Sequence, residues 1–358
     1  MRIEVDCERI RRNTEAVATL CAPQGIELAG VTKACCGHPA VARAMLAGGA
    51  GLLAESRLDN VRRLRKAGID CPILMLRLPS FDEVDEVVRL TQASLNSQVE
   101  TVGALSRAAQ AQGVDHRVIL MVEAGDRREG VMPERVLEVA RAMAGLPHIE
   151  LAGLGVNVTC IGGVLPTREN TQLAVDLAID VERALGLRLP TISAGNSASL
   201  ALLLRGEMPA RATQLRVGGA ILIGEVDSTG DWPTAMPHQD AFVVWAPVIE
   251  VETKPSTPEG PVAPNAFGEV PVWPDKGRRR RAIVAAGRQD LVIESLVPHR
   301  PGVIIVGASS DHLVLDVTEA DPAVRLGEEL AFRPLYGAIA TGMASRTATQ
   351  VIKPHTGG

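Results

Sequence analysis

LAGVTKACCGHP, at residues 28–39, is the stretch from which the fold can be worked out. Its apolar first part has the length of a buried strand, and this run ends abruptly at Lys33. Lysine is among the residues least often buried in a protein. On its own, Lys33 also fits a surface lysine whose stem lies along apolar groups. At the end of a buried strand, it instead predicts a pocket that uses the amine.

Outward from this stretch, one rhythm repeats from residue 27 to about 224: an apolar run, then a helix-period segment rich in Ala, Leu, Arg and Glu. Strands that are hydrophobic throughout are typical of parallel sheets buried on both faces. Eight of them alternating with helices predict an α/β fold, a (β/α)8 TIM barrel, with an open doubly wound sheet as the alternative. The eight runs are LAGVTK (28–33), GLLAES (51–56), PILMLRL (72–78), ASLNS (93–97), RVILMVEAG (117–125), ELAGLGVNV (150–158), TISAGN (191–196) and LRVGGAILIG (215–224).

The composition and spacing pattern of the sequence change after about residue 225. Pro and Gly become dense, as in TKPSTPEGPVAPNAFG at 253–268, and the apolar segments become short and closely spaced. This pattern predicts a C-terminal domain of mostly antiparallel strands. We therefore expect a barrel over residues 1–228 and a β domain over 229–358. The arginine run at 278–281 is interpreted as a solvated or subunit-contacting face rather than an anion site.

Composition excludes some classes of partner. The 358 residues carry a net charge of −5 and only 2% aromatic residues, which does not suit nucleic acid. No apolar run approaches 18 residues, and charges follow the first methionine closely, so we expect a cytoplasmic protein that binds no membrane. The six cysteines have no C-x-x-C pair and no histidines at zinc spacing, which predicts free, mostly buried thiols and no metal site. Cys35 and Cys36 fit small packing residues better than a site lining.

Polar residues at the predicted strand ends indicate a cofactor. In such barrels the chemistry lies at the carboxyl ends of the strands, and the loops after strands seven and eight commonly hold a phosphate. Backbone N–H groups of Gly218, Gly219 and Ala220, with the Ser197 hydroxyl, can form that cradle, although paired glycines also suit a plain turn. A desolvated lysine is a competent nucleophile for aldehydes. A phosphorylated aldehyde suits both features, so the expected cofactor is pyridoxal 5′-phosphate, held on Lys33.

Seven motifs in order along nearly the whole chain carry a family resemblance. They are VTKA (31–34), GDRREG (125–130), GVNVTC (155–160), SAGNSAS (193–199), LRVGGAILIGE (215–225), AGRQD (286–290) and GASSDHLVLDV (307–317). The chain resembles the ornithine racemase branch of the alanine racemase-like, fold type III pyridoxal-phosphate enzymes. The resemblance implies a barrel followed by a β domain, a homodimer whose active sites are shared between subunits, and racemisation of an amino acid.

The resemblance also implies roles for the strand-end residues. Lys33 carries the cofactor, and Arg216 faces its pyridine nitrogen. An arginine can only donate, so that nitrogen stays neutral, the ring is a weaker electron sink, and reprotonation at Cα is favoured over transamination. Arg128 is placed to bind the substrate carboxylate or a cofactor oxygen. On the cofactor side, Asn157 stands where relatives often carry a histidine, and Asn196 and Ser197 match the phosphate end.

One departure concerns the second catalytic base. Alanine racemases use a tyrosine of the partner's β domain, within a Tyr-Gly segment, and this chain has Phe267 at that place, in NAFGEV. We rank His312 first as the replacement, because histidine titrates near neutrality. The alternatives are Asp311, Asp290 and Tyr336, and Tyr336 also fits a contact with the phosphate. Asp290 or Asp311 is expected to receive the distal ammonium of a basic substrate such as ornithine or lysine.

Two other functions remain compatible with the sequence. The first is a lyase of the same fold, an aldolase or decarboxylase, which the missing tyrosine favours. Aldolases of this kind need a divalent metal, and the scattered histidines offer no ligand cluster. The second is a pyridoxal-phosphate carrier without turnover. Small carriers that resemble this barrel lack the β domain, so the second domain favours an enzyme.

Overall fold

The chain divides into two compact units. A computed structural model describes residues 1–225, 236–270 and 272–355. One unit contains Cys7–Gln239, and the other combines Met1–Asp6 with Asp240–Lys353. The first few residues therefore belong with the C-terminal part of the chain and not with the barrel. The domain boundary predicted between residues 228 and 229 lies outside the described residues.

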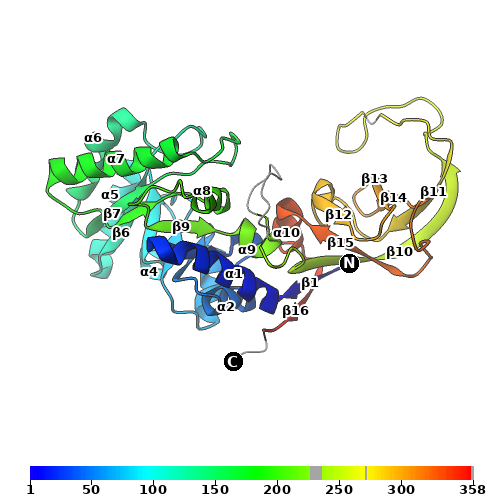
Figure 1. The fold of residues 1–358 in the computed structure, drawn as a ribbon, viewed down its shortest axis with the longest axis horizontal. Helices are drawn as coiled ribbons and strands as arrows, with labels where there is room; N and C mark the ends of the chain where they lie inside the picture. The colour runs from blue at the N-terminus through cyan, green and yellow to red at the C-terminus, as the bar shows by residue number, and fades with distance from the viewer. Residues whose placement is uncertain (226–235, 271, 356–358) are drawn as a thin grey trace. The chain divides into compact units, whose positions relative to one another are not determined.

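The larger unit is a closed barrel of eight parallel strands (Figure 1). The ring closes because β2 pairs with β9, which places Ala29 beside Arg216 and Glu27 beside Gln214. This closure confirms the barrel and excludes the open sheet. The strands are β2 (Glu27–Val31), β3 (Leu52–Glu55), β4 (Ile73–Met75), β5 (Ala93–Asn96), β6 (His116–Met121), β7 (Ile149–Gly155), β8 (Thr191–Ser193) and β9 (Gln214–Val217).

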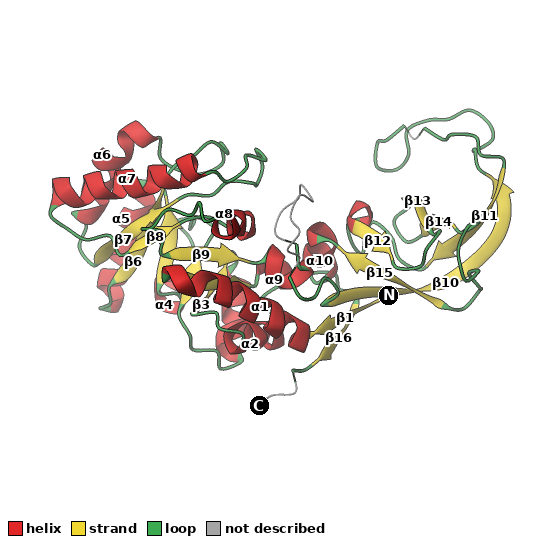
Figure 2. Ribbon diagram, in the orientation of Figure 1, coloured by secondary structure: helices red, strands yellow, loops and turns green. Residues whose placement is uncertain are grey.

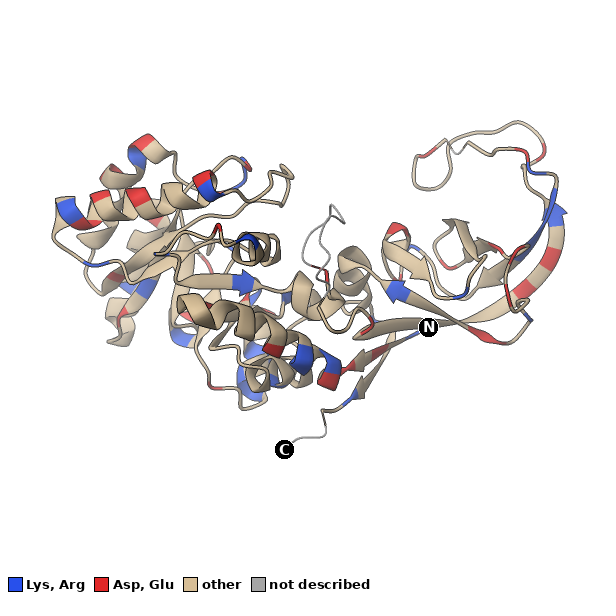
Figure 3. Cartoon of the chain, in the orientation of Figure 1, with Lys and Arg blue, Asp and Glu red and all other residues tan. Residues whose placement is uncertain are grey.

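Helices alternate with these strands along the chain and surround them (Figure 2). The helices carry charged residues at many positions, whereas the strands are largely uncharged (Figure 3). Amphipathic helices over a sheet buried on both faces account for the repeating rhythm of the sequence. The helices are α1 (Cys7–Cys21), α2 (Pro39–Ala47), α3 (Leu58–Lys66), α4 (Val84–Leu90), α5 (Val99–Gln112), α6 (Val136–Ala144), α7 (Arg168–Leu185), α8 (Leu200–Arg205) and α9 (Gly219–Ile223).

The prediction of a strand over residues 215–224 was wrong for the second half of that run. The strand stops at Val217, and the residues of α9 form a short helix in which Leu222 N–H donates to the Gly218 carbonyl at 2.9 Å. All the apolar side chains of α9 are buried. A short, continuous apolar run does not distinguish a buried strand from a buried helical turn, which explains the error.

The smaller unit is built on a mostly antiparallel sheet of eight strands, as predicted for the C-terminal part of the chain. Six strands follow the order β12-β15-β10-β11-β14-β13; β1 pairs antiparallel with β10 and parallel with β16. The elements are β1 (Arg2–Asp6), β10 (Phe242–Pro255), β11 (Arg278–Val284), β12 (Leu296–Pro298), β13 (Ile304–Ala308), β14 (Leu313–Asp316), β15 (Glu329–Pro334), α10 (Tyr336–Gly342) and β16 (Thr349–Lys353). The short apolar segments predicted as strands here, AFVVWAPVIEV (241–251), RAIVAAG (281–287), GVIIVGAS (302–309), HLVLDV (312–317) and ELAFRPL (329–335), correspond to β10, β11, β13, β14 and β15. Strands β1, β12 and β16 were missed.

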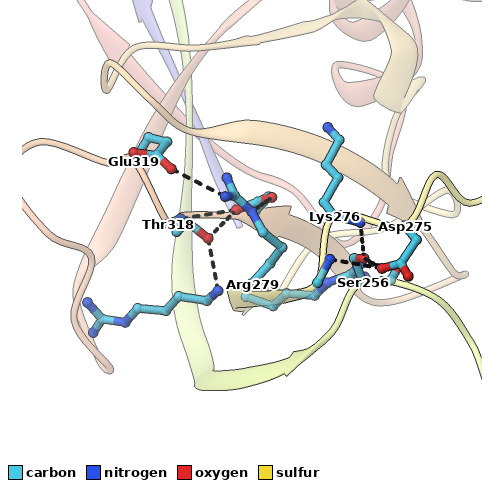
Figure 4. A network of polar contacts seen from close by, with 10 residues as sticks. Ser256, Asp275, Lys276, Arg279, Thr318 and Glu319 are labelled. Atoms are coloured by element: carbon cyan, nitrogen blue, oxygen red, sulfur yellow. Dashed lines mark hydrogen bonds and ion pairs between the residues drawn. The ribbon is translucent and has the colours of Figure 1, made fainter.

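The arginine run at 278–281 is occupied by contacts within its own unit. Arg279 Nε donates to Asp316 Oδ2 at 2.8 Å, and Arg279 Nη1 donates to Glu319 at 3.3 Å (Figure 4). Arg280 and Arg281 donate to the carbonyls of Val324 and Ser256. Because these guanidinium groups already donate hydrogen bonds to carboxylates and carbonyls, the arginine run orders the sheet and its adjoining loops.

Within the described ranges, no helix is long and apolar enough to cross a membrane. The same residues contain no group of three or more His, Cys, Asp or Glu side chains arranged to hold a metal ion.

Candidate functional site

Lys33 stands at the carboxyl end of the barrel. It lies two residues after β2 and opens a single turn of 3-10 helix, Lys33–Cys35. Thr32 N–H donates to the Ala54 carbonyl at 3.1 Å, which ties this turn to β3. The turn then reverses through Gly37, whose φ is +58°, and a Cβ there would meet Asn60 O at 2.9 Å. The local chain therefore requires glycine at this position and holds the lysine at the mouth of the barrel.

The side chain of Lys33 is exposed, and the pKa of its amine is lowered. Its side chain is exposed, not buried as the strand pattern suggested, and it has no hydrogen bond or ion pair among the described residues. Surrounding protein still desolvates the ammonium and lowers the pKa of Lys33, and the positive charges of Arg128 and Arg216 lower it further. A lowered pKa raises the fraction of neutral, nucleophilic amine. The lysine therefore has the chemistry predicted for it, in a more open position.

Glu55, which the sequence analysis did not consider, lies near this lysine. It ends β3, is fully buried, and accepts hydrogen bonds from Asn60 Nδ2 at 2.8 Å and Thr32 Oγ1 at 3.2 Å. Burial raises the pKa of Glu55, while its negative charge opposes the lowering of the Lys33 pKa. The glutamate at the end of the apolar run GLLAES was the available signal.

Arg216 lies in β9 and is buried, with 4% of its surface exposed. Its Nη2 donates to the Val156 carbonyl at 2.8 Å and to Asn157 Oδ1 at 3.3 Å, and its Nη1 contacts Ser193 Oγ. Burial lowers the pKa of Arg216 to about 10, so the group stays cationic at neutral pH. The structure thus holds a permanent positive charge in the wall of the barrel beside Asn157. Its predicted partner, a pyridine nitrogen, stays a prediction.

Ser197 and the turn after β9 form a cluster of donors. Backbone N–H groups of Gly218 and Ala220 both lie 3.2 Å from Ser197 Oγ. Asn196 orders the same turn, since its Oδ1 accepts from Ala198 N at 2.9 Å and its Nδ2 donates to the Val158 carbonyl at 2.6 Å. Convergent N–H groups beside a hydroxyl are what an anion needs.

The two glycines of this turn have different reasons to be glycine. At Gly218 a Cβ would lie 3.0 Å from the Val31 Cβ, so close packing of β9 against β2 favours glycine. At Gly219 a Cβ would come no closer than 3.5 Å to Ser197 Oγ, which is ordinary contact. The predicted phosphate role of Gly218 and Gly219 stays a prediction.

Arg128 belongs to the loop that follows β6. It is exposed, makes a two-pronged ion pair with Glu129, and donates from Nη1 to Cys160 Sγ at 2.7 Å. The ion pair raises the pKa of Arg128. Glu129 and Cys160 were not predicted as site residues, although both lie in motifs quoted above. All six thiols are free, and Cys160 is the one of them that is exposed.

Cys35 and Cys36 agree better with the packing interpretation. Cys35 is buried, and its Sγ lies 3.1 Å from the Thr32 carbonyl. Desolvation raises the pKa of both thiols, which makes them poor nucleophiles.

The remaining predicted site residues belong to the smaller unit. Asp290 is held in a turn, where Oδ2 accepts from Gly287 N at 2.9 Å and Oδ1 from Thr347. Asp311 and His312 are exposed in the turn between β13 and β14, and Tyr336 begins α10. Phe267 is 46% exposed, with the Arg288 guanidinium 5.0 Å from its ring centroid. The catalytic and substrate-binding roles of Asp290, Asp311, His312 and Tyr336 stay predictions.

Comparisons with known proteins give the site its context. The family model for the N-terminal domain of alanine racemase matches residues 5–225. An ornithine racemase of Acetoanaerobium sticklandii is 36% identical over 345 residues, which cover 96% of this chain and 97% of that protein. A lysine racemase of Thermotoga maritima is 35% identical over 353 residues, which cover 99% and 98%. The crystal structure of D-threonine aldolase from Filomicrobium marinum superposes with a TM-score of 0.74 at 22% identity, over 96% of this chain and 88% of that one, and shows the shared fold.

Proposed function

The chain belongs to the alanine racemase family, in the branch that contains ornithine and lysine racemases, and we propose that it interconverts the L- and D-enantiomers of a basic amino acid. The observation that carries this proposal is similarity to two racemases of basic amino acids along almost the entire length of each. The site adds an amine just after β2 that has no hydrogen-bond partner among the described residues, which suits a catalytic lysine.

The donor set of the barrel mouth fits pyridoxal 5′-phosphate. Lys33 offers an amine with a lowered pKa for the aldehyde. Ser197, with the N–H groups of Gly218 and Ala220, offers a cradle for the phosphate. Arg216, held by Val156 and Asn157, would face the ring nitrogen with a guanidinium that stays cationic. A phosphate, an aldehyde and a ring acceptor thus each have a complementary group in this chain.

The cofactor, once bound, withdraws electrons from Cα and so acidifies the α-proton. Lys33 then accepts that proton on one face of Cα or returns it there. Arg216 keeps its own protons and leaves the ring nitrogen neutral, which limits electron withdrawal and favours return of a proton to Cα. Arg128 binds the substrate carboxylate through a charge-assisted pair.

We also propose a homodimer in which the smaller unit of one copy contributes to the site of the other. The resemblance to alanine racemases supports this arrangement, with His312, Asp311 or Tyr336 near the substrate. Asp290 is a weaker candidate, because both of its carboxylate oxygens already accept hydrogen bonds. Sedimentation of the purified protein at several concentrations tests the dimer. A cytoplasmic location stays a prediction from the sequence.

A lyase is the second candidate function, because an aldolase shares the fold. The test incubates purified protein and pyridoxal phosphate with single enantiomers of ornithine, lysine and alanine. Chiral chromatography follows the enantiomers, and mass spectrometry follows the products. We expect inversion of ornithine or lysine without a change of mass. Products of altered mass would instead establish a lyase, and cofactor binding without turnover would establish a carrier.

A further inference from the structure

Racemisation needs proton transfer on both faces of Cα, and Lys33 supplies only one. The group predicted for the second face comes from the smaller unit. The barrel mouth itself contains another proton-bearing side chain, Cys160, which is exposed in the loop after β7.

Two neighbours hold Cys160 in place. Arg128 Nη1 donates to its Sγ at 2.7 Å, and Asp126 Oδ1 accepts its backbone N–H at 3.3 Å. Both neighbours come from the loop after β6, so the thiol sits where two strand-end loops meet. The Arg128 guanidinium therefore fixes the position of the Cys160 sulfur at the mouth of the barrel.

The same junction contains an unsatisfied polar atom. Asp126 is 2% exposed, and its Oδ2 has no hydrogen-bond partner among the described residues, although Oδ1 of the same carboxylate holds the Cys160 backbone. A buried oxygen without a donor costs free energy. This oxygen therefore indicates that the junction is completed by a donor that the described residues do not supply, such as a bound ligand.

The order of strands in the ring places Lys33 and Cys160 on different sides of the cofactor anchors. Lys33 follows β2 and Cys160 follows β7, and β8 and β9 lie between these strands in the closed barrel. The residues that fit the phosphate and the ring nitrogen belong to β8, β9 and their loops. A ligand anchored there has the Lys33 turn next to it on the β2 side and the Cys160 loop next to it on the β7 side. Both Cys160 and Arg128 are close enough to Lys33 to influence its charge.

We propose that Cys160 is the catalytic acid–base group for the face of Cα opposite Lys33. This inference rests on the proposed racemase function. In one direction the Lys33 amine takes the α-proton as the C–H bond breaks, and the Cys160 S–H gives its proton to the other face as a new C–H bond forms. The reverse direction exchanges the two roles. The ammonium then loses a proton to water and the thiolate regains one, so no electrons are transferred and the cycle closes.

The test compares Cys160→Ala and Cys160→Ser with wild type in deuterated water, starting from each enantiomer separately. Removal of a positioned acid–base group commonly costs roughly 10²- to 10⁴-fold in rate, and we expect racemisation to fall within that range for Cys160→Ala. Deuterium should still enter one enantiomer, through Lys33, without inversion, while exchange from the other enantiomer collapses. Cys160→Ser keeps the size and the hydrogen bond but not the acidity of a thiol, so it should show the same one-sided exchange.

Cys71→Ala is the matched control. Cys71 is a half-buried thiol just before β4, at the opposite end of the barrel strands. Its replacement by alanine should leave exchange from both enantiomers unchanged. A second readout does not depend on turnover: iodoacetamide should alkylate Cys160 in the cofactor-free protein, and pyridoxal phosphate with substrate should slow that alkylation.

Two results would overturn the assignment. One is racemisation by Cys160→Ser within about threefold of wild type with two-sided exchange; the other is alkylation that is indifferent to ligand. One-sided exchange in His312→Ala instead would return the role to that histidine. A wild-type protein that inverts neither ornithine nor lysine would refute the proposed function itself, so the two failures are distinguishable.

Discussion

Replacement of Ser197 by alanine tests whether the turn after β9 binds the cofactor phosphate. The hydroxyl oxygen accepts two backbone N–H groups at 3.2 Å, from Gly218 and Ala220. Ser197→Ala therefore removes the one side-chain donor of this cluster and leaves the backbone groups in place. If a phosphate lies here, the variant loses a hydrogen bond to a charged acceptor.

The expected magnitude follows from the number of bonds. A hydrogen bond to a charged group contributes about 1.5–3 kcal/mol, so the dissociation constant for pyridoxal 5′-phosphate should rise roughly 10- to 150-fold. In the cofactor-free protein, the same change leaves two N–H groups without their acceptor. The loss of these two hydrogen bonds lowers the free energy of unfolding by about 1–2 kcal/mol.

The assay titrates cofactor-free protein with pyridoxal 5′-phosphate and, separately, with pyridoxal, which lacks the phosphate. Ser197→Ala should weaken only the phosphorylated compound. Ser199→Ala, in the same helical turn but with its hydroxyl toward Gly195, controls for local disorder and should bind both compounds as wild type does. Equal weakening of both compounds by Ser197→Ala would refute the phosphate cradle.

Three further predictions can be checked on the same protein. Borohydride reduction of the cofactor-loaded protein followed by peptide mapping should place the adduct on Lys33, and an adduct on any other lysine would contradict the mechanism. Arg216→Glu, with the cofactor still bound, should increase transamination relative to racemisation, measured as keto acid formed per inversion; an unchanged ratio would mean that ring electronics are set elsewhere. Burial lowers the pKa of His116 from 6.5 to about 4, so the unfolded chain binds a proton that the folded chain does not, and stability should fall by up to about 3 kcal/mol as pH drops through that window. Urea unfolding of His116→Gln should lack this slope, and an equal slope would assign the acid sensitivity to other groups.

The barrel could be predicted because its strands are buried on both faces and therefore stand out as apolar runs. Once eight parallel strands are recognised, the fold itself places their carboxyl ends at one edge. Lys33 and Ser197 were found in this way, from their positions at the ends of apolar runs, whereas Arg216 stands at the start of the eighth run. No knowledge of long-range contacts was needed for these three.

The smaller unit was harder to predict, because its pairings span most of the chain. Strand Arg2–Asp6 pairs with residues 242–245 and with 349–353, and nothing in its five residues names those partners. Short strands at a chain end also lack the repeated pattern that identified the barrel. The prediction therefore assigned these residues to the barrel that follows them.

Cys160 and Glu129 were missed for a different reason. Both lie in loops, where a side chain's surroundings depend on geometry that periodicity does not encode. The expectation that free cysteines are buried was a statistical one, and Cys160 departs from it beside Arg128. The signal was present in the motif GVNVTC, but it did not indicate which way the thiol would face.

Lys33 and Arg216 show why a strand-end cation alone does not define a role. Arg216 is buried and bonded to the Val156 carbonyl, and even with its pKa lowered to about 10 it keeps its charge. It is suited to hold a fixed electrostatic environment. Lys33 is exposed, without a hydrogen-bond partner among the described residues, and its lowered pKa makes proton loss easier. A reaction that removes and returns a proton needs one group of constant charge and a second group that readily gains and loses a proton. The buried Arg216 meets the first requirement, and the exposed Lys33 meets the second.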